Sequence, residues 1–115
     1  MSPRFEPVSV TELSRVPLLA AIPGADLVVL AGRLERSDAP PGSVIRRPGG
    51  DDGKRYVIVL SGLASVASPT GRGLLRPGDV FDAEERPEAT VGAMTPCVVV
   101  GCDAATYDEL IRPHL

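Results

Sequence analysis

Turn-forming residues recur at short intervals along the chain and limit the length of any regular segment between them. Gly and Pro each account for 12 of the 115 residues. The apolar runs between the turns are short, and Tyr56–Leu60 is rich in the β-branched residues that favour a buried strand. Short strands at regular spacing are typical of a β-sandwich or barrel. We therefore expect a mainly β fold.

Further strands are predicted from the same succession of apolar runs and turns. They are expected at Ser43–Arg46, Leu63–Ala67, Leu74–Leu75, Ala89–Met94 and Cys97–Gly101. Each is bounded by Gly, Pro, Ser or Asp, which supply the backbone conformations that turns require. Four valines of these strands are expected in the core, namely Val57, Val59, Val98 and Val100.

Helical periodicity is confined to the two ends of the chain. A first helix is predicted to begin near Ser9 and to bury Leu13 and Val16, and Pro17 and Pro23 keep it short. A second follows, with apolar residues at helical spacing, and it is expected to turn Arg33, Glu35 and Arg36 toward solvent; the apolar residues are Leu27, Leu30, Ala31 and Leu34. A last helix is predicted between the capping residue Asp103 and Pro113, with Tyr107, Leu110 and Ile111 facing inward.

The charge of the chain argues against nucleic acid as a partner. The net charge is −3, and no basic run is longer than the pair Arg46–Arg47, whereas a nucleic-acid groove needs clustered Lys and Arg. No apolar run approaches the roughly 20 residues of a membrane-spanning helix, and the N-terminus lacks an apolar leader. We expect a tail at residues 1–8 and one folded domain at residues 9–115, located in the cytoplasm, with no membrane partner.

The residues that commonly carry enzyme chemistry are scarce. Cys97 and Cys102 would point to opposite faces of one strand, too far apart to form a disulfide, so both are expected as small buried hydrophobes. The only histidine is His114, which leaves no catalytic triad and no histidine metal site. Asp51–Asp52 lacks the further oxygen ligands of a calcium site. We therefore expect neither an enzyme nor a bound metal.

Several segments, in this order, resemble the cyclic-nucleotide-binding domains of the catabolite-activator type. They are Val16–Ala20 before the leucine-rich helix, Pro41–Ile45, Tyr56–Gly62, Pro77–Phe81 and Ala89–Val91, and the resemblance covers the chain from about Leu13 to its end. It implies a jelly roll, or double-stranded β-helix, of about eight strands with short flanking helices. Cupins share the jelly roll, but their metal is held by barrel histidines that this chain lacks.

The resemblance also implies a ligand site. In that family the phosphate-binding cassette reads Phe-Gly-Glu, then a short helical turn, then Arg-x-Ala-Thr. The helix N-terminus and the arginine hold the cyclic phosphate, and the glutamate accepts a hydrogen bond from the ribose. The candidate ligand-binding residues of this chain are Gly78, Phe81, Ala83, Glu84, Arg86, Ala89 and Thr90.

The chain departs from the family pattern between Phe81 and Val91. Asp82 and Ala83 replace the Gly-Glu pair, the helical turn is missing, and Pro87 stands in the place of the arginine, with Arg86 one position early. A charged hydrogen bond to phosphate contributes about 1.5–3 kcal/mol. One carboxylate about 5 Å from the phosphate opposes it by roughly 3 kcal/mol at an effective dielectric constant of 20. The acidic segment therefore predicts a degenerate cassette.

Two functions remain open. The first is a regulatory or interaction domain for signal transduction that does not bind cAMP or cGMP in the usual way and needs no cofactor. Its partner would be a protein, a separate output domain or a second copy of the chain. The second is a genuine sensor that binds a cyclic nucleotide or another small molecule through the Phe81–Ala89 cassette.

The acidic segment and the C-terminus carry two further expectations. Asp82–Glu88 is expected to be exposed and mobile, because nothing in it resembles a core anchor, and to offer a negative surface to a basic partner or a second copy. No output segment follows Ile111–Leu115 in this sequence. The resemblance therefore implies an output domain in another protein or in a longer chain.

Overall fold

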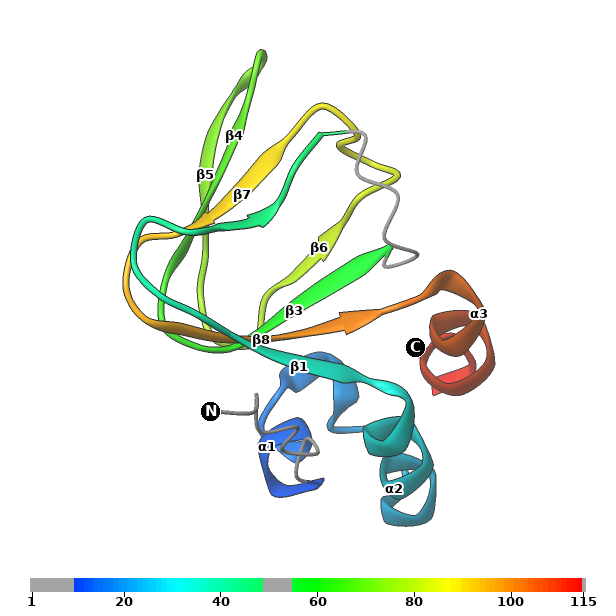
Figure 1. Cartoon of the computed structure of the whole chain (residues 1–115). Helices are drawn as coiled ribbons and strands as arrows, with labels where there is room; N and C mark the ends of the chain where they lie inside the picture. Colours follow the sequence, from blue (N-terminus) through cyan, green and yellow to red (C-terminus); the bar gives the residue numbers. More distant parts are fainter. Residues whose placement is uncertain (1–9, 49–54, 115) are drawn as a thin grey trace.

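Two four-stranded antiparallel sheets pack face to face, and helices cover the outer face of one of them (Figure 1). The computed structural model of the chain describes residues 10–48 and 55–114. The tail expected at residues 1–8 and the pair Asp51–Asp52 lie outside the described residues. Among these residues, no helix is long and apolar enough to cross a membrane.

The first sheet has the strand order β1-β8-β3-β6, and the second has the order β2-β7-β4-β5. In chain order the strands are β1 (Glu35–Ala39), β2 (Val44–Arg46), β3 (Tyr56–Ser61), β4 (Ala64–Ser68), β5 (Gly71–Leu75), β6 (Val80–Asp82), β7 (Thr90–Ala93) and β8 (Cys97–Cys102). The prediction of a mainly β jelly roll with short flanking helices is therefore confirmed.

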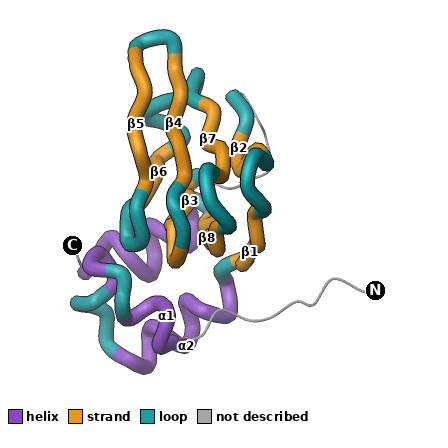
Figure 2. Tube along the Cα trace, turned by 90° about the vertical axis from the view of Figure 1, so that its left-hand side faces the viewer, coloured by secondary structure: helices purple, strands orange, loops and turns teal. Residues whose placement is uncertain are grey.

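The helices of both chain ends lie on the same side of the sandwich (Figures 1 and 2). They are α1 (Val10–Ser14), a 3-10 helix (Pro17–Leu19), α2 (Gly24–Arg33), α3 (Ala104–Thr106), a π-helical turn (Tyr107–Ile111) and a final 3-10 turn (Arg112–His114). The Asp103 carboxylate caps α3 by accepting the N–H of Thr106 at 2.7 Å. Pro113 does not end this segment as predicted, because it lies within the final turn, where its fixed φ is compatible with a helical conformation.

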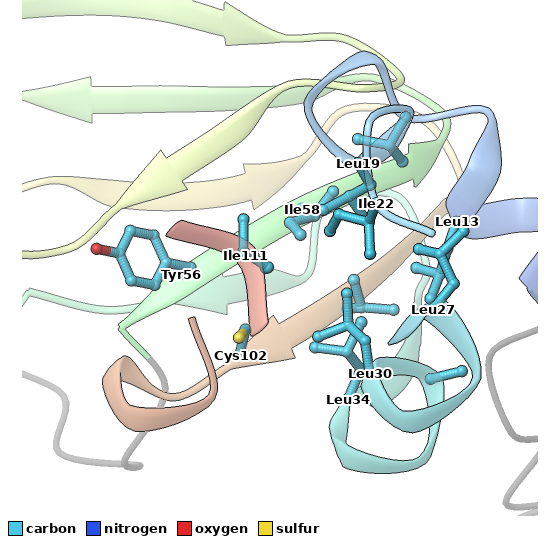
Figure 3. Packing of buried hydrophobic residues seen from close by; sticks show 13 residues of the cluster. Leu13, Leu19, Ile22, Leu27, Leu30, Leu34, Tyr56, Ile58, Cys102 and Ile111 are labelled. Atoms are coloured by element: carbon cyan, nitrogen blue, oxygen red, sulfur yellow. The ribbon is translucent and has the colours of Figure 1, made fainter. Parts of the chain in front are cut away.

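The first sheet separates two cores. Residues of β3 alternate between them: Tyr56 and Ile58 pack against the helices, and Val57 and Val59 pack between the sheets. Figure 3 shows Ile58 among leucines and isoleucines that include Leu19 and Ile111 of the helical segments and Ile22 of the connection before α2. This sheet is therefore buried on both faces, which explains why the β3 sequence is apolar at consecutive positions.

The two cysteines follow the same alternation. Cys97 lies in the core between the sheets, and Cys102 lies in the core beneath the helices. Both are buried, and neither forms a disulfide. The prediction that they face opposite sides of one strand and form no disulfide is confirmed.

Strand β1 was not predicted. The sequence analysis placed Glu35 and Arg36 on the helix that corresponds to α2, which was wrong. The N–H of Leu34 closes the last helical hydrogen bond to Leu30 at 3.1 Å, and its backbone is extended, with φ −91° and ψ 144°. Glu35–Ala39 then pairs with β8. The polar sequence of β1 has no apolar alternation, so only its pairing with a distant strand reveals it.

The core prediction was wrong for one of the four valines. Val57, Val59 and Val100 are buried, whereas Val98 is only half-buried. The register between β3 and β8 shifts between Val59 and Ser61, so Val98 pairs with the end of β3. A bulge of this kind bends the strand locally.

A substitution at Gly62 tests the packing of the β3–β4 turn. Its φ is +84°, and an added Cβ would overlap the carbonyl oxygen of Pro96 and lie 2.9 Å from the Cα of Cys97. Gly62→Ala should therefore lower the free energy of unfolding by more than about 1 kcal/mol, measured by urea unfolding. Gly32→Ala is the control, since Gly32 in α2 has open space around it and the change should raise helix stability by up to about 1 kcal/mol. Equal effects of both changes would contradict the described turn.

Candidate functional site

The segment between β6 and β7 forms a compact turn and no helix. The backbone N–H of Arg86 donates to the carbonyl of Asp82 at 3.4 Å, and the N–H of Ala89 donates to the carbonyl of Arg86 at 3.2 Å. These two bonds close the segment onto itself over Asp82–Ala89. We call Asp82–Ala89 the acidic turn.

Strand pairing brings Arg55 to the start of the acidic turn. Tyr56 pairs with Asp82, and the N–H of Ala83 donates to the carbonyl of Arg55 at 2.9 Å. The guanidinium of Arg55 donates from Nε to Oδ1 of Asp82 at 3.0 Å and from Nη2 to Oδ2 at 3.1 Å. Its Nη1 lies 3.0 Å from Oε2 of Glu84. One arginine thus binds two of the four carboxylates of the turn.

The carboxylate of Asp82 also accepts a backbone hydrogen bond from the turn itself. Its Oδ1 accepts the N–H of Glu84 at 2.9 Å. The hydrogen bonds from Arg55 hold the pKa of Asp82 below its ordinary value, against the opposing effect of burial, and the N–H groups of Glu84 and Glu85 act in the same direction. The same pair raises the pKa of Arg55. Asp82 therefore stays ionised and fixed between an arginine and a backbone donor.

The turn is anchored at both ends, contrary to the expectation of a wholly exposed segment. Ala83 is 8% exposed and Ala89 is 2% exposed, and both belong to the core between the sheets. Glu84, Glu85 and Glu88 are exposed as expected. Alanine side chains are small enough to enter the core without a helical turn. The prediction of a wholly exposed segment considered only large apolar side chains as anchors.

Two clefts border the acidic turn. One, of about 300 Å³, is lined by Ser68, Thr70 and Gly71 and by four charged residues. These are the arginines Arg72 and Arg86 and the glutamates Glu85 and Glu88. The other, of about 270 Å³, lies over β4, β5 and β6 and also includes Glu85 and Arg86. Arg86 makes no ion pair with any residue in the described ranges 10–48 and 55–114. The first cleft has no net charge from its lining residues.

The predicted ligand-binding residues are only partly brought together. Phe81 and Arg86 line the second cleft, and Glu84 lies beside Arg55. Buried Ala83 and Ala89 and half-buried Thr90 do not line either cleft. Gly78 lies elsewhere: an added Cβ there would be 2.9 Å from Cδ of Pro17, near the N-terminal helices.

An aromatic stack continues from Arg55 to the C-terminal segment. The rings of Tyr56 and Tyr107 stack with centroids 3.7 Å apart and an interplanar angle of 14°. Arg55 lies 4.9 Å from the Tyr56 centroid, and Arg112 lies 6.0 Å from the Tyr107 centroid. Burial raises the pKa of both phenols. The acidic turn is thus connected by side-chain contacts to the C-terminal segment.

Sequence reasoning overlooked Arg55 and Arg72 as members of the site. Arg55 precedes the buried run Tyr56–Leu60, so a β3–β6 pairing could have placed it opposite the residue after Asp82. Arg72 pairs with Ala67 on the β4–β5 hairpin. The contact of Arg55 with Asp82 joins segments 27 residues apart in the chain, and no local pattern places the β4–β5 hairpin with Arg72 beside the acidic turn.

Several solved structures have a fold similar to that of this chain. The regulatory domain of protein kinase A from Toxoplasma gondii, with cAMP, has a TM-score of 0.71 and 24% identity, covering 88% of this chain and 43% of that one. The regulatory subunit of a cAMP-independent protein kinase A from Trypanosoma brucei, as a mutant bound to cAMP, has a TM-score of 0.75 and 22% identity. The match covers 91% of this chain and 42% of that one. The corresponding regulatory subunit from Trypanosoma cruzi, bound to guanosine, has a TM-score of 0.72 and 21% identity. The match covers 90% of this chain and 41% of that one.

This chain has the fold of a cyclic-nucleotide-binding domain. It spans less than half the length of each of the three chains compared above. The sequence matches no protein-family model and no curated protein. The similarity therefore concerns the fold, and any ligand of this chain has to be inferred from its own residues.

The ion pair of Asp82 predicts an acid-sensitive contribution to stability. Because its pKa is lower in the folded chain than the ordinary value of 3.8, the contribution is present above that value and is lost as the pH falls through the folded pKa. Asp82→Asn should lower the free energy of unfolding at pH 7, and the difference from wild type should shrink as the pH falls from about 5 to below 3. Urea unfolding across this range measures it.

The control for this prediction is Glu88→Gln, since Glu88 is exposed and forms no ion pair with a described residue. Its free energy of unfolding should stay within about 0.5 kcal/mol of wild type at every pH. A difference between Asp82→Asn and wild type that does not change with pH would show that the ion pair does not stabilise the fold.

Proposed function

We propose that this chain is a non-catalytic regulatory or interaction domain in which the carboxylate of Asp82 occupies the anion site of the cassette. In the family pattern, backbone N–H groups and an arginine hold the phosphate of the ligand. Here the N–H of Glu84 and the guanidinium of Arg55 bind Asp82 instead. This internal anion is the observation that carries the proposal.

A phosphate brought to this place would meet a second obstacle. Glu84 and Glu85 follow Asp82 after a single residue, Ala83, and Glu88 lies in the same turn. A single carboxylate about 5 Å from a phosphate costs roughly 3 kcal/mol at an effective dielectric constant of 20, which equals a strong charged hydrogen bond. Ligand-free regulation through a protein partner, an output domain or a second copy is the role that we propose for the domain.

The charge-balanced cleft favours a second candidate function. Two arginines, Arg72 and Arg86, and two glutamates, Glu85 and Glu88, line a cleft of about 300 Å³, which lies at the lower end of the size range of small-molecule sites. Such a lining suits a neutral, hydrogen-bonding ligand better than a phosphate. The T. cruzi subunit of similar fold is bound to guanosine. A sensor of a neutral nucleoside is therefore the alternative, with Arg86 as its contact.

Ligand titration separates the two functions. The chain should show no rise in melting temperature with cAMP or cGMP at about 1 mM, because real binding at 100 times Kd would add about 2.7 kcal/mol to the free energy of unfolding. Guanosine, tested in parallel, addresses the alternative. A clear rise with any of the three that is abolished by Arg86→Ala would replace the ligand-free regulator by a sensor.

Removing the internal anion should open the site. Asp82→Gly frees the N–H of Glu84 and the Nε and Nη2 groups of Arg55, while Nη1 stays beside Glu84. Inorganic phosphate should therefore raise the melting temperature of this variant and leave that of wild type unchanged. The double variant Asp82→Gly with Arg55→Gln is the matched control and should lose the effect. Circular dichroism establishes that both variants are folded. Phosphate stabilising wild type and both variants equally would refute the role of Asp82.

A further inference from the structure

Exposed apolar side chains gather on the outer face of the second sheet. The helices of the described residues lie on the side of the first sheet and leave this face uncovered (Figures 1 and 2). Within the described ranges six large apolar side chains are exposed, and four of them belong to the second sheet or to the turns that adjoin it. These are Val44, Leu63, Leu74 and Met94, which are between 36% and 54% exposed. Apolar side chains grouped on one face mark interaction surfaces, whereas scattered ones do not.

Strand pairing places one row of residues across this face. Val44 of β2 pairs with Gly92 of β7. Ser65 of β4 pairs with Gly92 on one side and with Leu74 of β5 on the other. Ala64, the neighbour of Ser65, is buried between the sheets, so the alternation along β4 turns Ser65 and its row to the outer face.

A second row continues the apolar surface beyond the strand ends. The N–H of Met94 donates to the carbonyl of Leu63 at 2.9 Å, next to the pair of Ala64 with Ala93. Both alanines are buried, so Leu63 and Met94 point outward. We call the surface formed by the two rows the bare face, and its residues are Val44, Leu63, Ser65, Leu74, Gly92 and Met94.

The row across the sheet is high at its two ends and low in the middle. Val44 and Leu74 stand on the edge strands, and Gly92 and Ser65 stand on the central strands. The internal packing does not require a glycine at position 92. Its φ is not in the left-handed region, and an added Cβ would meet only ordinary contacts, at 3.6 Å from the carbonyl oxygen of Ser43 and 3.7 Å from Oγ of Ser65. Glycine inside a strand often marks the close approach of another backbone.

We infer that the bare face binds the apolar side of an amphipathic helix from a partner protein. The edge strands β2 and β5 are three strand spacings apart, which is about 14 Å, and a helix with its side chains is about 10–12 Å in diameter. A helix laid between Val44 and Leu74 fills the low centre over Gly92 and Ser65. This contact gives the proposed interaction domain a partner-binding face, and it uses neither Arg55 nor Asp82.

The size of the bare face argues against a second copy of the chain as the occupant. A stable dimer buries about 800 Å² on each partner, whereas the bare face is about 14 Å wide and its two rows are about 7 Å apart. Two such faces packed on each other would also leave a void over both low centres, which close packing disfavours. The four large side chains are uncharged, so binding should persist at high salt.

Amide chemical shifts of the 15N-labelled full chain test the inference. The probe is a peptide of about 16 residues, long enough to form a helix, with leucines along one side and alternating Lys and Glu elsewhere. The amides of Ser65, Leu74 and Gly92 should shift and saturate with this peptide at low and at high salt. A peptide of the same composition, scrambled so that it has no apolar side, should leave them in place.

Two kinds of substitution distinguish a helix from general apolar binding. Leu74→Ser should weaken peptide binding about fivefold, since it removes roughly half a buried leucine. Ser65→Phe adds apolar surface but fills the low centre, so it should abolish peptide binding, and Gly92→Val should act in the same way if Ser65→Phe does not fold. Val28→Ser is the matched control, because Val28 is exposed on α2, and it should leave peptide binding unchanged.

Four results would overturn the inference: no saturable shift, equal shifts with the scrambled peptide, tighter peptide binding by Ser65→Phe, or a loss with Val28→Ser as large as with Leu74→Ser. Self-association in sedimentation equilibrium that Leu74→Ser abolishes would assign the face to a second copy instead. Flotation with phosphatidylcholine vesicles that Leu74→Ser abolishes would assign it to lipid. Asp82→Gly should bind the peptide as wild type does, so failure of this inference and failure of the proposed anion site are distinguishable.

Discussion

The ion pair between Arg55 and Asp82 fixes the start of the acidic turn to strand β3, in addition to the pairing of β3 with β6. Arg55 precedes a strand buried on both faces, and Asp82 begins the acidic turn. Because β3 is held by two cores, the position of Arg55 is set by packing and not by its own flexible side chain. The turn is therefore aligned to a rigid strand through two parallel hydrogen bonds. The conformation of the acidic turn is in this way a consequence of the core.

The same arginine places the acidic turn next to the C-terminal segment. Arg55 lies over Tyr56, which stacks on Tyr107 of the π-helical turn, and Arg112 lies over the ring of Tyr107. Arg112 is in turn paired with Asp108 at 2.9 Å. A change in the charge of Asp82 would alter the field at Arg55 and then the environment of both rings. This continuous contact gives the proposed regulatory domain a physical route from its turn to its end.

Much of the fold could be predicted from the sequence because the signals were local. The buried run of β3, the turn at Gly62 and the opposite faces of Cys97 and Cys102 all follow from apolar pattern and strand alternation. Strand β1 and the role of Arg55 could not, since each depends on a partner strand distant in the chain. The candidate site was harder to predict: the sequence located the acidic turn, whereas the two arginines beside it come from β5 and from the residue before β3.

The acidity of the turn is explained by the arginines that lie in it and beside it. Four carboxylates lie in the turn, at Asp82, Glu84, Glu85 and Glu88, and three arginines lie in or beside it, at Arg55, Arg72 and Arg86. Asp82 and Glu84 share Arg55, and the remaining two glutamates lie in a cleft with the other two arginines. The charges of these four carboxylates and three arginines therefore nearly cancel. A cassette built to attract a phosphate would need an excess of positive charge, and this turn has none.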